Sequence, residues 1–193
     1  MSGPFDLLRW RGAFTHSPSF ELERPRRAAV ALVLGQPAPV SEPALLLVRR
    51  TERAGDPWSG HMALPGGHAE PHDVDLLHTA RRETLEEVGL DLSEAELLGT
   101  LDDVVPMRSS EISVRPFVFW APGARETVLS NEVAEALWVP IAQLASGALR
   151  ATRPVRVGAT TLEVPAYVID ERVVWGMTYR LLELFLERIR SAP

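Results

Sequence analysis

The stretch Arg82-Glu83-Thr84-Leu85-Glu86-Glu87-Val88-Gly89 decides the fold prediction, because it places four charges within six residues. A helix repeats every ~3.6 residues, so Glu83 would lie beside Glu86 and Glu87 on one helix surface. Like charges at this spacing weaken a helix. Mg²⁺ takes oxygen ligands and favours carboxylates together with substrate phosphates. The stretch therefore predicts a helix that binds a divalent cation, rather than a helix with only a folding role.

The residues around this stretch support the same prediction. Leu64-Pro65-Gly66-Gly67 predicts a tight turn whose glycines let the backbone approach a ligand. A mostly apolar stripe runs along a predicted helix at 74–88, away from the glutamates: Leu77, Ala80, Thr84 and Val88. Gly89 suits the position just after the helix. Arg82 precedes Glu86 by four residues, so its side chain is expected to hold the Glu86 carboxylate in place rather than to contact a substrate.

The order of these residues resembles the Nudix box. In that motif a glycine is followed by an acidic residue, Arg-Glu, Glu-Glu and a Gly-apolar pair. The matching positions are Gly67, Asp73, Arg82, Glu83, Glu86, Glu87, Gly89 and Leu90. Two features depart from the common box: the acidic residue is Asp73, and the gap to Arg82 is one residue longer. Thr84 also occupies a position that is usually apolar.

The longer gap is similar to that of the coenzyme A pyrophosphatase branch of the family. Four further segments resemble this branch: 59–63, 131–135, 138–140 and 175–178. The coenzyme A signature usually has an arginine four residues before the glycine that corresponds to Gly60, and here that position is Asp56. Arg49, Arg50 and Arg53 lie nearby but out of register, which leaves the substrate open.

The resemblance implies both a fold and an activity. The fold is an α/β/α sandwich with a mixed β-sheet between helices. The activity is metal-dependent hydrolysis of the pyrophosphate bond in a nucleoside diphosphate linked to another moiety, first of all coenzyme A or its derivatives. ADP-ribose, a nucleotide sugar or a dinucleoside polyphosphate are alternative substrates. A non-catalytic nucleotide-sensing domain is the alternative from another class, and it would be expected if the glutamates were replaced.

The predicted site combines metal ligands, a base and loop-structuring residues. Glu83, Glu86 and Glu87, with the Gly66 carbonyl, would hold Mg²⁺ or Mn²⁺ against a diphosphate. The loop-structuring set is Gly67, Glu70, Asp73 and Gly89, with Asp73 expected to bond the loop backbone. The resemblance implies Glu83 as one candidate for the general base. The family also uses a glutamate from a distant loop as the base, which makes Glu132 and Glu135 the other candidates. Arg82 completes the set of catalytic candidates.

Arginine and tryptophan side chains are the candidates for substrate contacts. Phosphate clamping is predicted for Arg49, Arg50, Arg53 and Arg108. Trp58 is placed to stack on a base or on the pantetheine arm, with core packing as the alternative. His61, His68, His72 and His78 are not predicted to form a metal cluster, since their spacing does not repeat at i,i+4 and oxygen ligands already serve magnesium.

The whole chain limits the class of protein. Its 193 residues, 46% hydrophobic and 24% charged, predict an N-terminal extension at 1–25 and a single domain at 26–193. The absence of cysteine excludes thiol chemistry, and all 20 basic residues are arginine. A net charge of −6 argues against nucleic-acid binding. No apolar run predicts a membrane span, so a cytoplasmic location is expected. Nudix proteins are often dimers, which leaves a homodimer open.

Apolar runs predict the remaining elements. Strands are expected at 28–34, 45–48, 97–105, 112–120 and 136–139, a hairpin around 158–159, a short helix at 140–144 and a final helix at 177–189. The final helix has an apolar stripe formed by Leu181, Leu184, Phe185 and Ile189.

Overall fold

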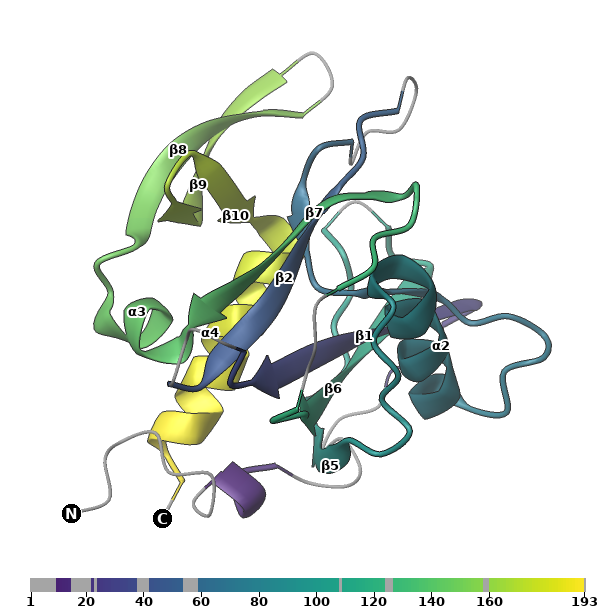
Figure 1. Ribbon diagram of the computed structural model, residues 1–193. Helices are drawn as coiled ribbons and strands as arrows, with labels where there is room; N and C mark the ends of the chain where they lie inside the picture. The colour runs from purple at the N-terminus through teal and green to yellow at the C-terminus, as the bar shows by residue number, and fades with distance from the viewer. Residues whose placement is uncertain are drawn as a thin grey trace.

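The computed structural model describes residues 10–14, 22, 24–37, 42–53, 59–107, 109–123, 127–157 and 160–192. Within these residues a mixed seven-stranded sheet lies between helices α2 and α4, and a three-stranded sheet stands beside it (Figure 1). The strands are β1 Arg26–Gly35, β2 Ala44–Arg50, β3 Met62–Ala63, β4 Gly66–His68, β5 Glu96–Thr100, β6 Ile112–Trp120, β7 Val133–Pro140, β8 Arg150–Val157, β9 Thr160–Ile169 and β10 Arg172–Trp175. The helices are α2 Leu76–Val88, α3 Ile141–Ser146 and α4 Gly176–Arg190. The predicted α/β/α sandwich is confirmed.

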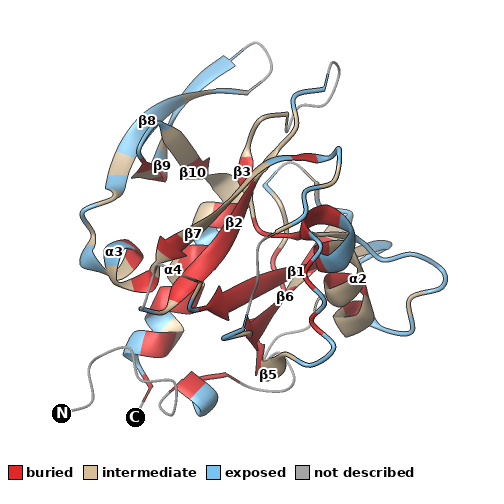
Figure 2. Cartoon of the chain, in the orientation of Figure 1, coloured by how far each residue is buried: buried red, intermediate tan, exposed pale blue. Residues whose placement is uncertain are grey.

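β1 is the central strand of the large sheet. It pairs in parallel with β6 and antiparallel with β2 and β4, while β2 also pairs with β7. Residues 28–35 are all buried, because α2 covers one face of the sheet and α4 the other (Figure 2). A strand covered on both faces reads as a continuous apolar run rather than an alternating one, which is why its sequence lacks a period of two.

The predicted N-terminal extension contributes to the core. Trp10 is fully buried, and Phe14 stacks on Phe185 of α4 with ring centroids 5.9 Å apart. Arg11 makes a paired contact with Glu96 at the start of β5, with N–O distances of 2.7 and 2.8 Å. Residues 10–14 therefore pack against α4 and belong to the same hydrophobic cluster as that helix. The domain boundary after residue 25 stays a prediction.

Several boundaries differ from those predicted. β5 ends at Thr100 instead of 105, because Gly99 shifts the register against β6 and Asp103 turns inward to bind Arg115. β7 begins at Val133, three residues earlier than predicted. β10 was not predicted at all, because it is four residues long and follows directly from the turn at Asp170, whose φ is 54°.

Gly66 and Gly67 do not form the predicted isolated turn. They belong to β4 and pair with Val30 and Ala29 of β1. At Gly66, φ is 148°, and an added Cβ would lie 2.3 Å from the Ala29 carbonyl oxygen. Glycine is required here because the backbone passes directly over β1.

Among the described helices, none is long and apolar enough to cross a membrane.

Candidate active site

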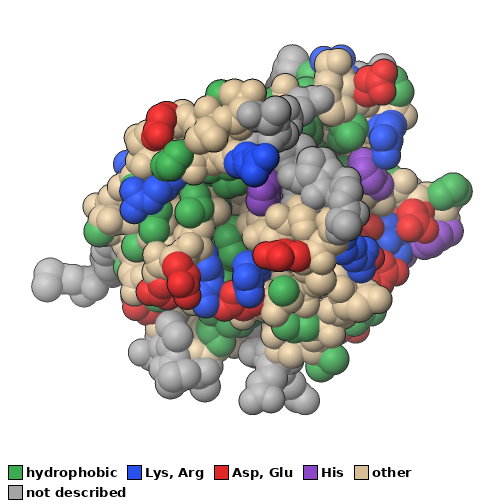
Figure 3. Space-filling view, turned by 90° about the horizontal axis from the view of Figure 1, so that it is seen from above, with side chains coloured by type: hydrophobic (Ala, Val, Ile, Leu, Met, Phe, Trp, Pro, Cys, Tyr) green, Lys and Arg blue, Asp and Glu red, His purple; other side chains and the backbone are tan. Residues whose placement is uncertain are grey.

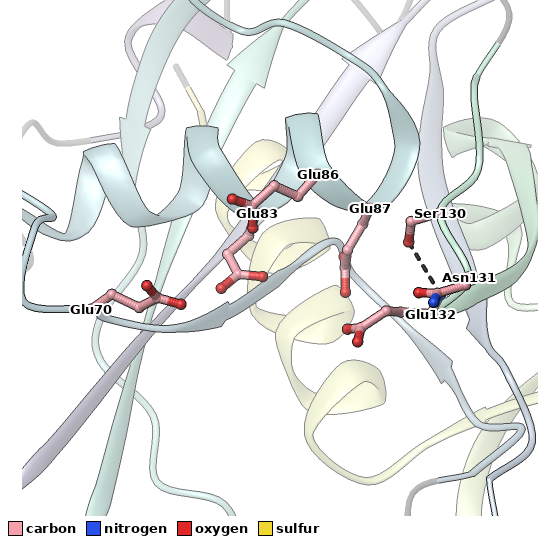
Figure 4. Close-up of a pocket in the computed structure, with 7 residues that line it drawn as sticks. All are labelled: Glu70, Glu83, Glu86, Glu87, Ser130, Asn131 and Glu132. Carbon is pink, nitrogen blue, oxygen red and sulfur yellow. Dashed lines mark hydrogen bonds between the residues drawn. The ribbon is translucent and has the colours of Figure 1, made fainter.

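An acidic cavity of about 350 Å³ opens beside α2 (Figure 4). Three of its carboxylates come from the helix, one from the loop before it and one from the loop that leads into β7. The lining residues are Glu70, Glu83, Glu86, Glu87, Ser130, Asn131 and Glu132. Figure 4 shows Glu83 and Glu87 projecting from the helix toward the cavity, with Glu132 on the facing loop. The structure therefore brings the three box glutamates and Glu132 together.

Glu87 is the most deeply buried of these carboxylates. Its side chain was predicted to lie away from the apolar stripe of α2, but the residue is only 6% exposed. The backbone N–H of Gly66 donates to Glu87 Oε2 at 3.0 Å. The pKa of Glu87 is raised to about 7, chiefly by burial and also by the charges of Glu83 and Glu132, while the Gly66 hydrogen bond and Arg50 oppose the shift. A buried carboxylate with this pKa favours an added positive charge.

Glu83 lies directly against the glycine strand. An added Cβ on Gly67 would lie 2.5 Å from each of Glu83 Cδ and Oε1. Gly67 is therefore glycine because the carboxylate of Glu83 fills the space of a side chain. Burial raises the pKa of Glu83, and the hydrogen bond from Arg82 opposes this effect.

Arg82 binds carboxylates from two elements. Its Nε and Nη2 donate to Asp73 at 3.0 and 2.9 Å, and its Nη2 also donates to the His68 carbonyl at 3.1 Å. Its Nη1 donates to Glu83 at 2.9 Å and to Glu86 at 3.0 Å. The expected bond between Arg82 and Glu86 is present. Arg82 therefore orients these acidic side chains, and these bonds favour a role in positioning the carboxylates over a direct part in a reaction.

Asp73 organises the loop before α2. Its side chain is 1% exposed and accepts the Glu70 backbone N–H at 2.9 Å, as expected for a loop-structuring residue. It also accepts from the Thr79 hydroxyl at 2.9 Å, and His78 Nδ1 lies 2.7 Å from its Oδ1. Hydrogen bonds from Arg82, the largest cause, hold the pKa of Asp73 well below its usual range. Asp75 caps the helix by accepting the His78 N–H, and Gly89 ends it with φ at 69°.

The two glutamates near β7 have different surroundings. Glu132 lines the acidic cavity. Glu135 lies on β7 itself, where Arg172 of β10 binds it and Arg49 Nε lies 3.2 Å from its Oε2. The hydrogen bond from Arg172 lowers the pKa of Glu135. Of these two candidates for the base, the structure places only Glu132 among the residues that line the cavity.

The predicted substrate arginines do not form one group. Arg49 contacts Glu135, Arg50 is close enough to Glu87 to lower its pKa, and Arg53 binds Glu132. Figure 3 shows the wider pattern, with basic and acidic side chains next to one another on the face seen from above. Trp58 and Arg108 lie outside the described residues. His61 packs edge-on against Trp175 with ring centroids 5.1 Å apart.

The donor set suits a divalent metal ion in its chemistry. It consists of hard carboxylate oxygens, and buried Glu87 has a raised pKa that a nearby cation would relieve. In the described part of the chain, no three acidic or histidine side chains already converge on one point. Instead, Glu83 and Glu86 both bind Arg82. Glu83, Glu86 and Glu87 would be the residues to hold a divalent metal ion at this cavity, where it would supply positive charge against a phosphate.

Comparison with known proteins decides the family. The NUDIX domain family matches residues 24–157, more than half of the chain. The chain belongs to the Nudix family. It is a Nudix hydrolase, and such enzymes generally use divalent metal ions. The predicted resemblance is confirmed, and the hydrolase relatives favour an enzyme over a non-catalytic sensor.

Relatives of this Nudix hydrolase include a named coenzyme A enzyme. Human mitochondrial coenzyme A diphosphatase NUDT8 is 32% identical over 166 residues, which cover 85% of this chain and 70% of that protein. Protein C14C4.10c of Schizosaccharomyces pombe is 39% identical over 141 residues, 62% of this chain and 43% of that protein. The chain thus spans less than half the length of the yeast protein. Among solved structures, the NUDIX domain of Shewanella oneidensis NrtR, complexed with ADP ribose, matches this chain with a TM-score of 0.55 at 17% identity. The match covers 87% of this chain and 90% of that one, and it supports the fold.

The raised pKa of Glu87 predicts a pH-dependent stability. The folded protein holds this proton more tightly than the unfolded chain, whose Glu titrates near 4.5. The stabilisation is complete below pH 4.5 and is lost as pH rises through about 7. We expect a loss of about 3 kcal/mol over this window, at about 1.4 kcal/mol per pKa unit. Urea titrations in chelating buffer at pH 5 and pH 8 measure it. Glu87→Gln should abolish this component, and an unchanged pH dependence in that variant would contradict the assignment.

Gly67→Ala should separate activity from folding. The new methyl group would occupy the space of the Glu83 carboxyl, which is the end of a flexible side chain and can move. We expect a stability change of about 1 kcal/mol or less but a fall in kcat of roughly 10²-fold, because small displacements at a reacting centre have effects of this size. Thermal melts and steady-state kinetics test this. Gly66→Ala is the contrasting variant, since its methyl group would overlap backbone, and it should unfold at a much lower temperature.

Proposed function

We propose that this Nudix hydrolase cleaves the pyrophosphate bond of coenzyme A or its derivatives. The observation that carries this proposal is the 32% identity to the human coenzyme A diphosphatase across 85% of the chain. The products would be 3′-phosphoadenosine 5′-phosphate and a 4′-phosphopantetheine. The acidic cavity supports the reaction type, and the extent of the similarity supports the substrate.

Glu83, Glu86 and Glu87, with the Gly66 carbonyl, would hold Mg²⁺ or Mn²⁺. When bound, the metal neutralises phosphate charge and activates a water. Arg82 keeps Glu83 and Glu86 at the cavity through its Nη1 bonds. Deprotonated Glu87 is the form that binds a cation, so its pKa of about 7 makes metal binding strengthen as pH rises through neutrality.

Glu132 is the proposed general base. It lines the cavity from the loop opposite α2, so it reaches the site from a direction that the helix glutamates do not use. In the proposed step, a water oxygen bonds to one phosphorus of the diphosphate while Glu132 accepts the water proton. The bond from that phosphorus to the bridging oxygen breaks, and the electron pair leaves with the departing phosphate. Glu83 is the alternative base.

A substrate panel tests the proposal. Phosphate-bond hydrolysis would be measured with Mg²⁺ and Mn²⁺ on coenzyme A, acetyl-coenzyme A, ADP-ribose, NADH, diadenosine polyphosphates and UDP-glucose. A kcat/KM for coenzyme A at least ten times that of every other compound supports the proposal. Preference for ADP-ribose or a dinucleoside polyphosphate would keep the reaction type and reject the substrate. The homodimer stays a prediction, which size-exclusion chromatography with light scattering tests. The cytoplasmic location also stays a prediction.

A further inference from the structure

Arg53 connects the segment after β2 to the loop that carries Glu132. Its Nη1 donates to Glu132 Oε1 at 3.0 Å. Its Nη2 contacts the Asn131 carbonyl at 3.4 Å and the Asn131 side-chain oxygen at 3.5 Å. The backbone N–H of Thr51 donates to the Glu132 carbonyl at 2.8 Å. The segment 51–53 thus contacts both the backbone and the carboxylate of Glu132.

The same loop is held from the other side by the end of α2. Ser130 N–H donates to the Glu87 carbonyl at 3.0 Å, and Val128 N–H donates to the Val88 carbonyl at 2.9 Å. The Ser130 hydroxyl accepts the Glu132 N–H at 3.2 Å. These bonds fix the backbone at Glu132 relative to the helix that carries the other carboxylates. They leave the rotamer of the Glu132 side chain to be set by its own contacts.

The Glu132 side chain is half-exposed, at 51%, and so is that of Arg53, at 45%. A long side chain in such a position has several accessible rotamers, and ordering it has an entropic cost. A general base must lie within about 3 Å of the proton that it accepts. The guanidinium also places a positive charge beside Glu132, whose negative charge helps to raise the pKa of Glu87 across the cavity. One contact therefore both orients the carboxylate and favours its position in an acidic cavity.

We propose that Arg53 is a positioning residue that holds the Glu132 carboxylate at the cavity for proton transfer. This inference rests on the proposed role of Glu132 as base. It replaces the sequence-based prediction that Arg53 clamps a substrate phosphate. The two roles differ in what they control: a phosphate clamp governs substrate binding, whereas a positioning residue governs turnover.

A double-mutant cycle tests the proposal with the best substrate of the panel. Wild type, Arg53→Gln, Glu132→Gln and the double variant would be compared by steady-state kinetics, with circular dichroism to verify folding. We expect Glu132→Gln to lower kcat by about 10²–10⁴-fold. Arg53→Gln should lower kcat by roughly 10–10²-fold with KM nearly unchanged. The double variant should be no slower than Glu132→Gln alone, and Arg53→Lys should recover part of kcat.

Arg11→Gln is the matched control. Arg11 also forms an exposed ion pair with a glutamate, but its partner is Glu96 of β5 and Arg11 is not among the residues that line the cavity. Its kcat and KM should equal those of wild type. A raised KM with normal kcat in Arg53→Gln would make Arg53 a substrate contact and overturn the inference, as would multiplicative losses in the cycle. Normal kcat in Glu132→Gln, or no wild-type turnover on any compound, would overturn the base assignment and the inference together.

Discussion

Glu86→Gln is expected to lower kcat by about 10²–10³-fold, the loss typical of removing one group that stabilises charge at a reacting centre. Glu86 has a side chain that is 58% exposed and bonds to Arg82 Nη1. Its replacement deletes a negatively charged oxygen ligand and leaves the core of α2 untouched. Folding should change little, because an exposed ion pair contributes about 0–1 kcal/mol.

Kinetics at saturating Mg²⁺, with isothermal titration calorimetry of Mg²⁺ binding, measure the effect of Glu86→Gln. Glu163→Gln is the control, because Glu163 is an exposed glutamate on β9 and does not line the cavity. Its activity should match that of wild type. Near-normal kcat and metal affinity in Glu86→Gln would show that Glu86 is not a ligand.

Asp73→Ala is expected to destabilise the fold by about 3–5 kcal/mol, because it leaves the largely buried guanidinium of Arg82 without its main partner. For a domain of this size, that corresponds to a fall in melting temperature of roughly 6–20 °C. Glu96→Ala is the matched control, since it removes a carboxylate that pairs with Arg11 through two bonds but at an exposed position. Its effect should stay near 1 kcal/mol or below.

The effect of Asp73→Ala should also depend on pH. The folded-state pKa of Asp73 lies below its ordinary value of 3.8, so its stabilisation is present above pH 3.8 and is lost as pH falls toward the lower folded-state value. The difference in unfolding free energy between wild type and Asp73→Ala should therefore shrink from pH 7 to pH 2. Denaturant titrations at the two pH values measure it. A constant difference would mean that Asp73 acts through packing rather than charge.

The sequence predicted helix α2 well, because the pattern that indicates it lies within the helix itself. Helical periodicity placed the helix at 74–88, against 76–88 in the structure, and the i,i+4 spacing anticipated the bond from Arg82 to Glu86. The burial of Glu87 was not predicted. The groups that cover it come from β4 and from the loop near Ser130, and no pattern within the helix reports on segments so distant in the chain.

The choice between Glu132 and Glu135 also required three-dimensional information. They are three residues apart, and sequence alone placed both before a strand. β7 begins between them, so Glu135 joins the sheet and faces Arg172 of β10. β10 is four residues long and carries no signal that would place an arginine there. The pairing of Arg53 with Glu132 was missed for the same reason, since the two residues are 79 positions apart in the chain.

The packing of Trp10 and Phe14 against α4 has a consequence for how the chain folds as it is made. One face of the large sheet is covered by α4, the last of the described helices, and residues 10–14 pack on that helix. During synthesis, this apolar face stays uncovered until residues 176–190 have left the ribosome, although α2 and the large sheet have already emerged. The family match ends at residue 157, before α4 begins. A nascent chain of that length would carry every acidic residue that lines the cavity and would still lack α4, which covers one apolar face of the sheet.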